Sequence, residues 1–145
     1  MDYWDTSAIL KLYIPEHDSA YFLELITKTN AAILSSTIAS VEIIGALLRK
    51  ERAGDLRTGS PRTLLRRFRA DCAAGRIMLI PFGADVIQEA ERLAMLAFQR
   101  RRPIMVRSLD LVHLATALSA KATTVVATDK RLRDLGALLQ VRVLP

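Results

Sequence analysis

Short apolar runs alternate along the chain with longer segments whose apolar residues recur at helical spacing. The short runs predict five strands, at residues 2–5, 31–34, 76–81, 123–127 and 140–144. The periodic segments predict helices at 6–14, 18–28, 37–52, 60–75, 85–101, 108–121 and 129–135. Strands that are apolar throughout and alternate with helices are typical of a parallel sheet covered on both faces, so the pattern predicts an α/β fold built from βαβ units.

Capping signals predict where several of these helices begin and end. The helix at 37–52 is expected to take its cap from Ser35, Ser36 or Thr37 and to end at Gly54. Its predicted buried face consists of Val41, Ile44, Leu47 and Leu48. Three further end signals are Ser60 before Pro61, Ser108, and Gly136.

Length and composition bound the class of protein. A chain of 145 residues favours a single domain, 1–145, and 51% hydrophobic with 25% charged residues is ordinary for a globular protein. No apolar run approaches the roughly 18 residues of a membrane span, and the acidic start lacks the basic region of a signal peptide, so we expect a cytoplasmic protein without membrane association. Cys72 is the only cysteine, which excludes an intrachain disulfide, and its expected role is a small half-buried side chain.

Four acidic residues stand at the ends of apolar segments or inside them: Asp5, Glu42, Asp110 and Asp129. Burying one carboxylate is costly, and several close together also repel one another. A bound divalent cation would offset both costs for all four acids at once, which predicts a metal site and metal-dependent chemistry. Asp5 and Asp129 follow the first and fourth predicted strands, at the sheet edge where ligands of such folds bind.

Each of these acids also has a purely structural interpretation. Asp5 and Asp129 can cap the helices that follow them, and Asp110 can complement a helix dipole from the first turn. Glu42 is harder to explain in this way, because it is expected past the first turn and has no cation at the favoured helical spacing. His113 lies one turn after Asp110; a packed histidine is the commoner case, and its contact with the site stays open.

The charge of the chain favours an anionic partner. The formal net charge is +6, with 21 Lys and Arg against 15 Asp and Glu, and 16 of the basic residues are arginines. Arginine binds phosphate well, although the bias also fits a GC-rich genome. Arg62, Arg66 and Arg69 share one predicted helix face, which is either a solvated surface or a surface that binds RNA.

Four segments of the chain together resemble the motifs of PIN-domain ribonucleases, especially VapC-type toxins of toxin–antitoxin pairs. They are Trp4 to Tyr13, Ser36 to Leu48, Leu109 to Ala117 and Val126 to Leu132. The resemblance implies a three-layer α/β/α sandwich with a five-stranded parallel sheet and an acidic pocket that binds Mg²⁺ or Mn²⁺. Leu132 stands where many members carry an aromatic residue, a change that affects packing.

The resemblance also implies roles for individual residues and partners. Asp5, Glu42, Asp110 and Asp129 would be the metal-binding and catalytic acids, and the hydroxyls of Thr6, Ser7 and Thr128 would orient water or metal. The implied activity is endonucleolytic hydrolysis of RNA. The implied partners are a second copy of the chain and a cognate VapB-type antitoxin, which covers the pocket with a segment that often carries an arginine.

Two other classes of function fit the sequence less well. Haloacid-dehalogenase-like phosphotransferases need a second aspartate two residues after the first, where this chain has Ser7. Receiver domains place a lysine at the end of the last strand, and residues 140–145 contain none. The remaining alternative is a non-catalytic RNA- or protein-binding module in which the acids only cap helices.

Overall fold

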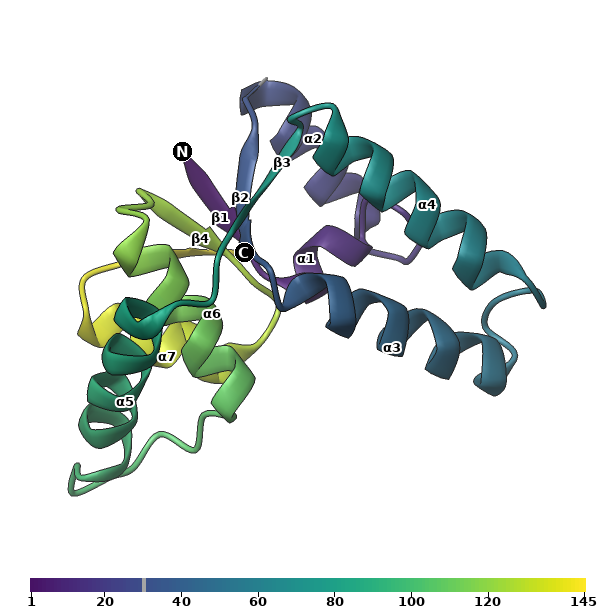
Figure 1. Cartoon of the computed structure of the whole chain (residues 1–145). Coiled ribbons are helices and arrows are strands. Elements are labelled where there is room, and N and C mark those ends of the chain that lie inside the picture. The colour runs from purple at the N-terminus through teal and green to yellow at the C-terminus, as the bar shows by residue number, and fades with distance from the viewer. Residues whose placement is uncertain (30) are drawn as a thin grey trace.

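A five-stranded parallel sheet forms the centre of the protein, as predicted (Figure 1). The computed structural model describes residues 1–29 and 31–145. The strands are β1 (Asp2–Trp4), β2 (Ile33–Ser36), β3 (Ile77–Ile80), β4 (Thr124–Val126) and β5 (Arg142–Leu144). The helices are α1 (Thr6–Leu10), α2 (Ser19–Thr29), α3 (Ala39–Ala53), α4 (Ser60–Ala73), α5 (Ala84–Phe98), α6 (Ser108–Ser119) and α7 (Lys130–Leu138).

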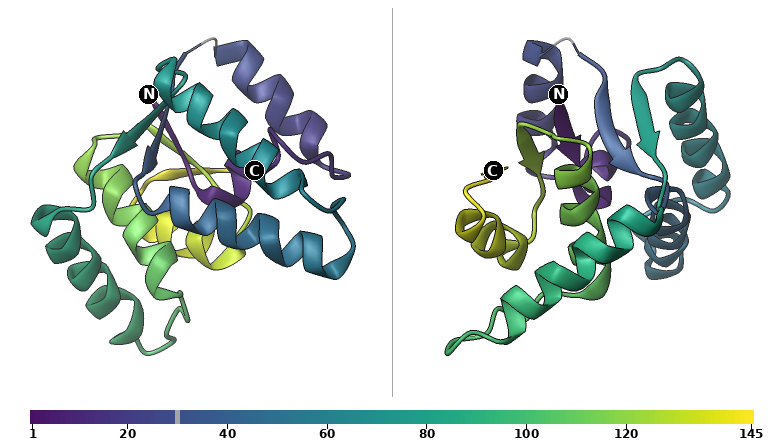
Figure 2. Two further views of the ribbon diagram at one scale, coloured as in Figure 1. Left: turned by 45° about the vertical axis from the view of Figure 1, so that its right-hand side comes forward. Right: turned by 60° about the vertical axis from the view of Figure 1, so that its left-hand side comes forward.

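Helices cover both faces of the sheet and make a three-layer α/β/α sandwich. Helices α5, α6 and α7 lie on one side, and α1 to α4 lie on the other (Figure 2). Neighbouring strand residues point to opposite faces, so Tyr3 packs in the core beneath α5 to α7 and Trp4 in the core beneath α1 to α4. Because both faces are covered, successive residues of β2 and β4 are buried without alternation.

The order of the strands, β3-β2-β1-β4-β5, places a switch point at β1. The chain moves outward from β1 through β2 to β3 and then returns to the other side of β1 as β4. The two connections that leave β1 and β4 therefore diverge at their carboxyl ends, which opens a crevice there. Asp5 follows β1 and Asp129 follows β4, so both acids lie at this crevice.

The buried face of α3 matches the prediction at Leu47, and Ile44 is half-buried, but the other two predicted residues are exposed. Ala39, Ile43 and Leu47 are buried, whereas Val41 is 73% exposed and Leu48 is 50% exposed. Apolar residues on α3 fit more than one helical stripe, and only the stripe that faces the sheet is covered. The predicted caps were also wrong, because residues 35 and 36 belong to β2 and the N-cap position, Ile38, forms no side-chain capping bond.

Three other predicted helix ends differ from those in the structure. Ser60 and Ser108 are the first residues of α4 and α6, and the cap positions are Gly59 and Arg107. Gly136 does not close α7 but lies inside it, because the helix passes close to β5 there. A Cβ at Gly136 would lie 2.4 Å from Cγ2 of Val143. Gly54 ends α3 as predicted, with a left-handed φ of 87°.

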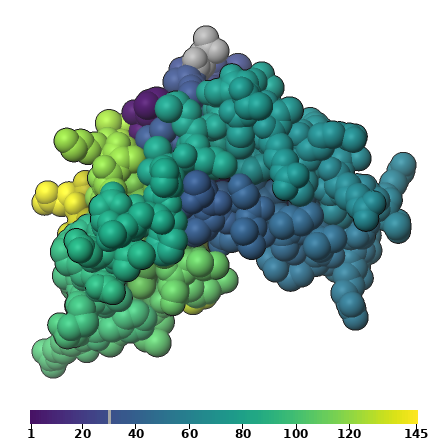
Figure 3. Space-filling view, in the orientation of Figure 1, coloured from purple at the N-terminus to yellow at the C-terminus, as the bar shows by residue number. Residues whose placement is uncertain are grey.

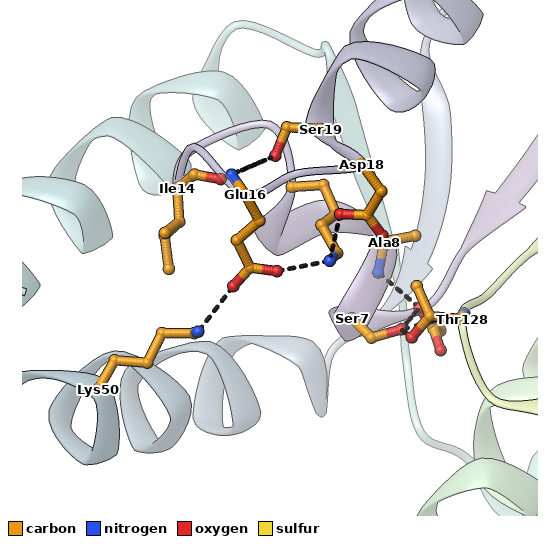
Figure 4. Close-up of polar contacts among 10 residues, drawn as sticks. Ser7, Ala8, Ile14, Glu16, Asp18, Ser19, Lys50 and Thr128 are labelled. Carbon is orange, nitrogen blue, oxygen red and sulfur yellow. Dashed lines mark hydrogen bonds and ion pairs between the residues drawn. The ribbon is translucent and has the colours of Figure 1, made fainter. Parts of the chain in front are cut away.

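A polar network ties the α1–α2 connection to α3 (Figure 4). The Glu16 carboxylate forms ion pairs with Lys50 of α3 at 2.6 Å and with Lys11 at 2.5 Å. Ser19 accepts a bond from the Glu16 backbone N–H and donates to the Ile14 carbonyl. These contacts hold α3 beside α1. Helix α3 forms one wall of the site described below, and the start of α1 lies at its floor. Within residues 1–29 and 31–145, no helix is both long and apolar enough to cross a membrane.

Candidate active site

All four acids line one pocket of about 570 Å³ at the carboxyl edge of the sheet. Its walls come from α3 on one side and α6 on the other, and the surface is hollowed between these helices (Figure 3). The starts of α1 and α7 supply the floor between the walls. The lining residues with polar chemistry are Asp5, Thr6, Ser7, Glu42, Arg49, Arg107, Asp110, His113, Thr128 and Asp129.

Each acid lies at the N-terminal end of a different helix. Asp5 and Asp129 are the N-cap residues of α1 and α7, and Glu42 and Asp110 lie in the first turns of α3 and α6. The expectation that Glu42 lies past the first turn was wrong, because α3 begins two residues later than predicted. Helix N-termini carry partial positive charge, which offsets part of the cost of burying these acids.

Asp5 is held by a short chain of hydroxyls. Its Oδ1 accepts bonds from the backbone N–H of Ala8 at 2.8 Å and from the Ser7 hydroxyl at 2.6 Å. The Ser7 oxygen accepts in turn from the Thr128 hydroxyl at 2.8 Å, and Figure 4 shows these two residues beside each other. The two strand-end loops after β1 and β4 are thereby linked across the pocket floor. Ser7 and Thr128 thus orient Asp5, and Thr6 contacts Glu42.

Glu42 is held by residues from two other elements. Its Oε2 accepts a bond from the Thr6 hydroxyl at 2.5 Å and lies 2.7 Å from Nε2 of His113. The His113 ring is 2% exposed, and its Nδ1 lies 2.6 Å from the hydroxyl of Tyr3. His113 therefore contacts the site directly, which settles the point that the sequence left open.

Asp110 and Asp129 share an arginine from their own chain. Arg107 lies 3.1 Å from Oδ2 of Asp129 through Nη2 and 3.6 Å from Oδ2 of Asp110 through Nε. Asp129 also caps α7 by accepting from the backbone N–H of Arg131 at 2.7 Å. The guanidinium of Arg107 offsets the charge of both acids, although its side chain is 68% exposed and free to move into solvent.

The carboxylates differ in how their surroundings shift their pKa values. Burial raises the pKa of Asp5, and its hydrogen bonds with Ser7 and Ala8 only partly oppose this. Burial also raises the pKa of Asp110, with a further contribution from the nearby charge of Asp129. Burial acts on Glu42 in the same direction, but the hydrogen bonds from His113 and Thr6 outweigh it and lower the Glu42 pKa. Asp5 and Asp110 therefore ionise less readily than ordinary carboxyl groups, and Glu42 ionises more readily.

A family model described as the PIN domain matches residues 3–138, which is nearly the whole chain. The chain belongs to the PIN domain family. No protein among the curated sequences matches it.

Solved structures with the same fold share little sequence with this PIN domain. VapBC2 from Rickettsia felis, bound to a DNA fragment from its promoter, matches with a TM-score of 0.70 at 18% identity, covering 99% of this chain and 97% of that chain. FitAcB from Neisseria gonorrhoeae matches with a TM-score of 0.62 at 16% identity, covering 100% and 97%. VapBC-1 from nontypeable Haemophilus influenzae matches with a TM-score of 0.65 at 14% identity, covering 99% and 96%.

The pocket of this PIN domain offers donors that suit a divalent cation. Carboxylate and hydroxyl oxygens are the ligands that Mg²⁺ and Mn²⁺ prefer. Asp110 Oδ2 is a buried oxygen with no hydrogen-bond partner among the residues described, and a cation could supply the partner that it lacks. In that same part of the chain, no three His, Cys, Asp or Glu side chains are gathered closely enough to hold an ion. Glu42 is engaged by His113, and Asp129 by Arg107, so binding requires side-chain movement.

The arginines that line the pocket are not those that the sequence suggested. Arg62, Arg66 and Arg69 are exposed on α4, and none of them is among the lining residues. Arg49 and Arg107 line it instead. Arg49 could have been suspected from its position two turns after Glu42 on the same helix. Arg107 lies three residues before Asp110, a spacing that could have been noticed, but its contact with Asp129, 22 residues away, had no local signal.

Proposed function

We propose that this PIN domain is a metal-dependent endoribonuclease and the toxin of a toxin–antitoxin pair. The observation that carries the proposal is the meeting of four acids, from the N-terminal ends of four helices, in one pocket at the switch point of the sheet. Four carboxylates in one pocket, two of them with raised pKa values, are poorly stabilised by protein groups alone. Such a cluster is typical of a site whose charge is completed by a ligand.

Asp5, Glu42, Asp110 and Asp129 would hold the cation, and Ser7 and Thr128 would keep Asp5 oriented toward it. When bound, Mg²⁺ or Mn²⁺ supplies neutralisation of phosphate charge and activation of a water molecule for attack on the phosphodiester. The carboxylates provide the charge that retains the ion while an anionic substrate enters. The net charge of +6 favours the approach of RNA.

The proposed partners follow from the family likeness and from the similar structures. These include VapBC and FitAB assemblies, and another is a toxin–antitoxin complex from Klebsiella pneumoniae. We therefore propose a VapB-type antitoxin for this chain, with a basic side chain entering the acidic pocket. Homodimer formation and action in the cytoplasm, where an RNA substrate is present, belong to the same proposal. Co-purification of a partner protein with the tagged chain and light scattering would test the two assemblies.

Cleavage of structured RNAs, including transfer RNA, by purified partner-free protein tests the activity. The assay compares Mg²⁺, Mn²⁺ and chelator, and it compares wild type with Asp5→Asn and Glu42→Gln. A matched control is Glu24→Gln, which changes a glutamate that is 64% exposed on α2 and lies outside the pocket lining. Metal-dependent cleavage that both pocket variants lose and the control retains supports a nuclease site.

The alternative is a binding module without catalysis. It is favoured by one observation, namely that Asp5 and Asp129 do cap α1 and α7. In that case RNA binding would persist without cleavage, and the pocket variants would behave like wild type. Growth arrest on expression, lost with Glu42→Gln, would separate an active toxin from this module.

A further inference from the structure

A chain of buried hydrogen bonds leads from the sheet to Glu42. The Tyr3 side chain on β1 is fully buried, and its hydroxyl lies 2.6 Å from Nδ1 of His113 on α6. The opposite nitrogen of the same ring, Nε2, lies 2.7 Å from Oε2 of Glu42 on α3. These three residues, here named the relay, join three elements that are distant in sequence.

The chemistry of the two ends determines which neutral tautomer of the ring fits between them. An ionised carboxylate can only accept, so Nε2 must carry the proton that it shares with Glu42. Nδ1 of a neutral ring is then an acceptor, and the Tyr3 phenol, protonated at neutral pH, is the donor that it needs. The other neutral tautomer would set the Nε2 lone pair against the carboxylate at 2.7 Å, which is repulsive.

We propose that Tyr3 is a positioning residue, whose hydroxyl holds His113 in the tautomer that donates to Glu42 and so orients the Glu42 carboxylate for a cation. Thr6 and His113 both bind Oε2, at 2.5 and 2.7 Å, which leaves Oε1 for another partner. Hydrogen bonds behind a ligating side chain commonly set its orientation and contribute 10- to 100-fold to metal affinity. The inference rests on the proposed function for its cation, but its tautomer can be tested without one.

The chain contains a matched control for loss of a tyrosine hydroxyl. Tyr13 is also a buried tyrosine, and its hydroxyl donates to Asp71. Neither of these residues is among those that line the acidic pocket. Tyr13→Phe therefore removes a carboxylate-bound hydroxyl elsewhere in the protein, whereas Tyr3→Phe removes the one that contacts His113.

The first measurement is the ¹⁵N spectrum of the imidazole rings in metal-free protein. The chain has one other histidine, the exposed His17, whose signal serves as an internal reference. We expect the Nε2–H tautomer for His113 in wild type and in Tyr13→Phe, and a changed signal in Tyr3→Phe. A ring with protons on both nitrogens, or an unchanged signal in Tyr3→Phe, would overturn the relay.

The second measurement is Mn²⁺ affinity by calorimetry, with kcat and KM for RNA cleavage where it is detected. Tyr3→Phe should bind Mn²⁺ about 10- to 100-fold more weakly and lower kcat, with KM for RNA little changed. If Tyr3→Phe fails to fold, His113→Gln and His113→Leu replace it, because glutamine can keep a donor near Glu42 and leucine cannot. Equal Mn²⁺ affinity of these two variants, or of wild type and Tyr3→Phe, counts against positioning.

Failure of the two proposals is distinguishable. Wild-type protein that neither binds Mn²⁺ nor cleaves RNA would overturn the proposed function and, with it, the role of the relay in orienting a ligand. Wild type that cleaves RNA while Tyr3→Phe shows unaltered Mn²⁺ affinity would retain the proposed function and overturn the relay alone.

Discussion

Replacing Asp110 by asparagine should make the metal-free protein more stable while weakening its response to metal. Oδ2 of Asp110 is buried without a hydrogen-bond partner among the described residues, and its only cationic contact is the exposed Arg107 at 3.6 Å. An unpaired buried polar group costs about 1–3 kcal/mol, and asparagine removes the charge but stays polar, so we expect a gain near the lower end, about 1 kcal/mol. For 145 residues the unfolding entropy is about 0.3 kcal/mol per kelvin, so the midpoint should rise by about 3 K.

The pH dependence of this gain has a definite sign. Burial raises the pKa of Asp110, so the folded protein binds this proton more tightly than the unfolded chain does. The carboxyl therefore costs no stability at a pH below the ordinary carboxylate range, and the cost develops as the pH rises toward the raised value. Asp110→Asn should match wild type in acid and exceed it at neutral pH, in urea unfolding with chelator present.

Bound metal should make wild type more stable than Asp110→Asn, the reverse of the order in metal-free protein. A ligand at one hundred times its dissociation constant stabilises by about 2.7 kcal/mol, which corresponds to about 9 K here. Wild type should show a shift of this size with Mn²⁺, and Asp110→Asn should show less than half of it. The control is Asp134→Asn, an exposed carboxylate on α7 paired with Lys130, which should change stability by less than about 0.5 kcal/mol. A metal-free Asp110→Asn protein less stable than wild type, or one with an undiminished Mn²⁺ shift, would refute this reasoning.

Substitutions at four further positions test separate parts of the structure. Asp5→Ala should lose about 1 kcal/mol through the α1 cap, whereas Asp5→Asn keeps an accepting oxygen and should unfold at nearly the wild-type urea concentration; equal losses would contradict the cap. Arg107→Ala removes a cation that lies 3.1 Å from Asp129 and 3.6 Å from Asp110, so Mn²⁺ should bind about fivefold more tightly in calorimetry. Unchanged or weaker binding would count against competition at this site. Gly136→Ala should destabilise by about 1–3 kcal/mol, because its Cβ would meet Cγ2 of Val143 at 2.4 Å. Gly45→Ala should raise the free energy of unfolding by up to about 1 kcal/mol, because the nearest atom to the new Cβ, at 3.3 Å, belongs to the mobile guanidinium of Arg49. If urea unfolding shows that both glycine variants are stabilised, or that both are destabilised, the contrast is refuted.

The strands and the class of fold could be read from local pattern because both faces of the sheet are buried. Runs of apolar and β-branched residues such as 77–80 and 124–126 lack the polar positions at every second residue that a strand with one exposed face would show. The confirmed strand β3 agrees with its prediction within one residue at each end. Helix ends were less well determined. A serine before an apolar segment fits both the cap and the first helical position, and the shifts at Ser60 and Ser108 are of this kind.

The stripe of α3 that is buried could not be read locally. Val41 and Leu48 are as apolar as Ile43 and Leu47, and periodicity alone does not say which side meets the sheet. Val41 instead lines the acidic pocket, beside Glu42. Which face of α3 is buried depends on how the helix is placed against the sheet. That placement is fixed by its connection to β2 and by the ion pair of Lys50 with Glu16.

The sequence by itself determined that this is an α/β protein and that four acids stand near strand ends and helix starts, since these properties depend on residues close together in the chain. The strand order, the shared pocket and the partners of each acid depend on contacts across the fold. Tyr3 and His113 are 110 residues apart, and Arg107 and Asp129 are 22 apart, so no local pattern links them. Only the packing of β1, α3, α6 and α7 around the switch point decided which charges meet, because electrostatic and hydrogen-bond energies depend on distance in space.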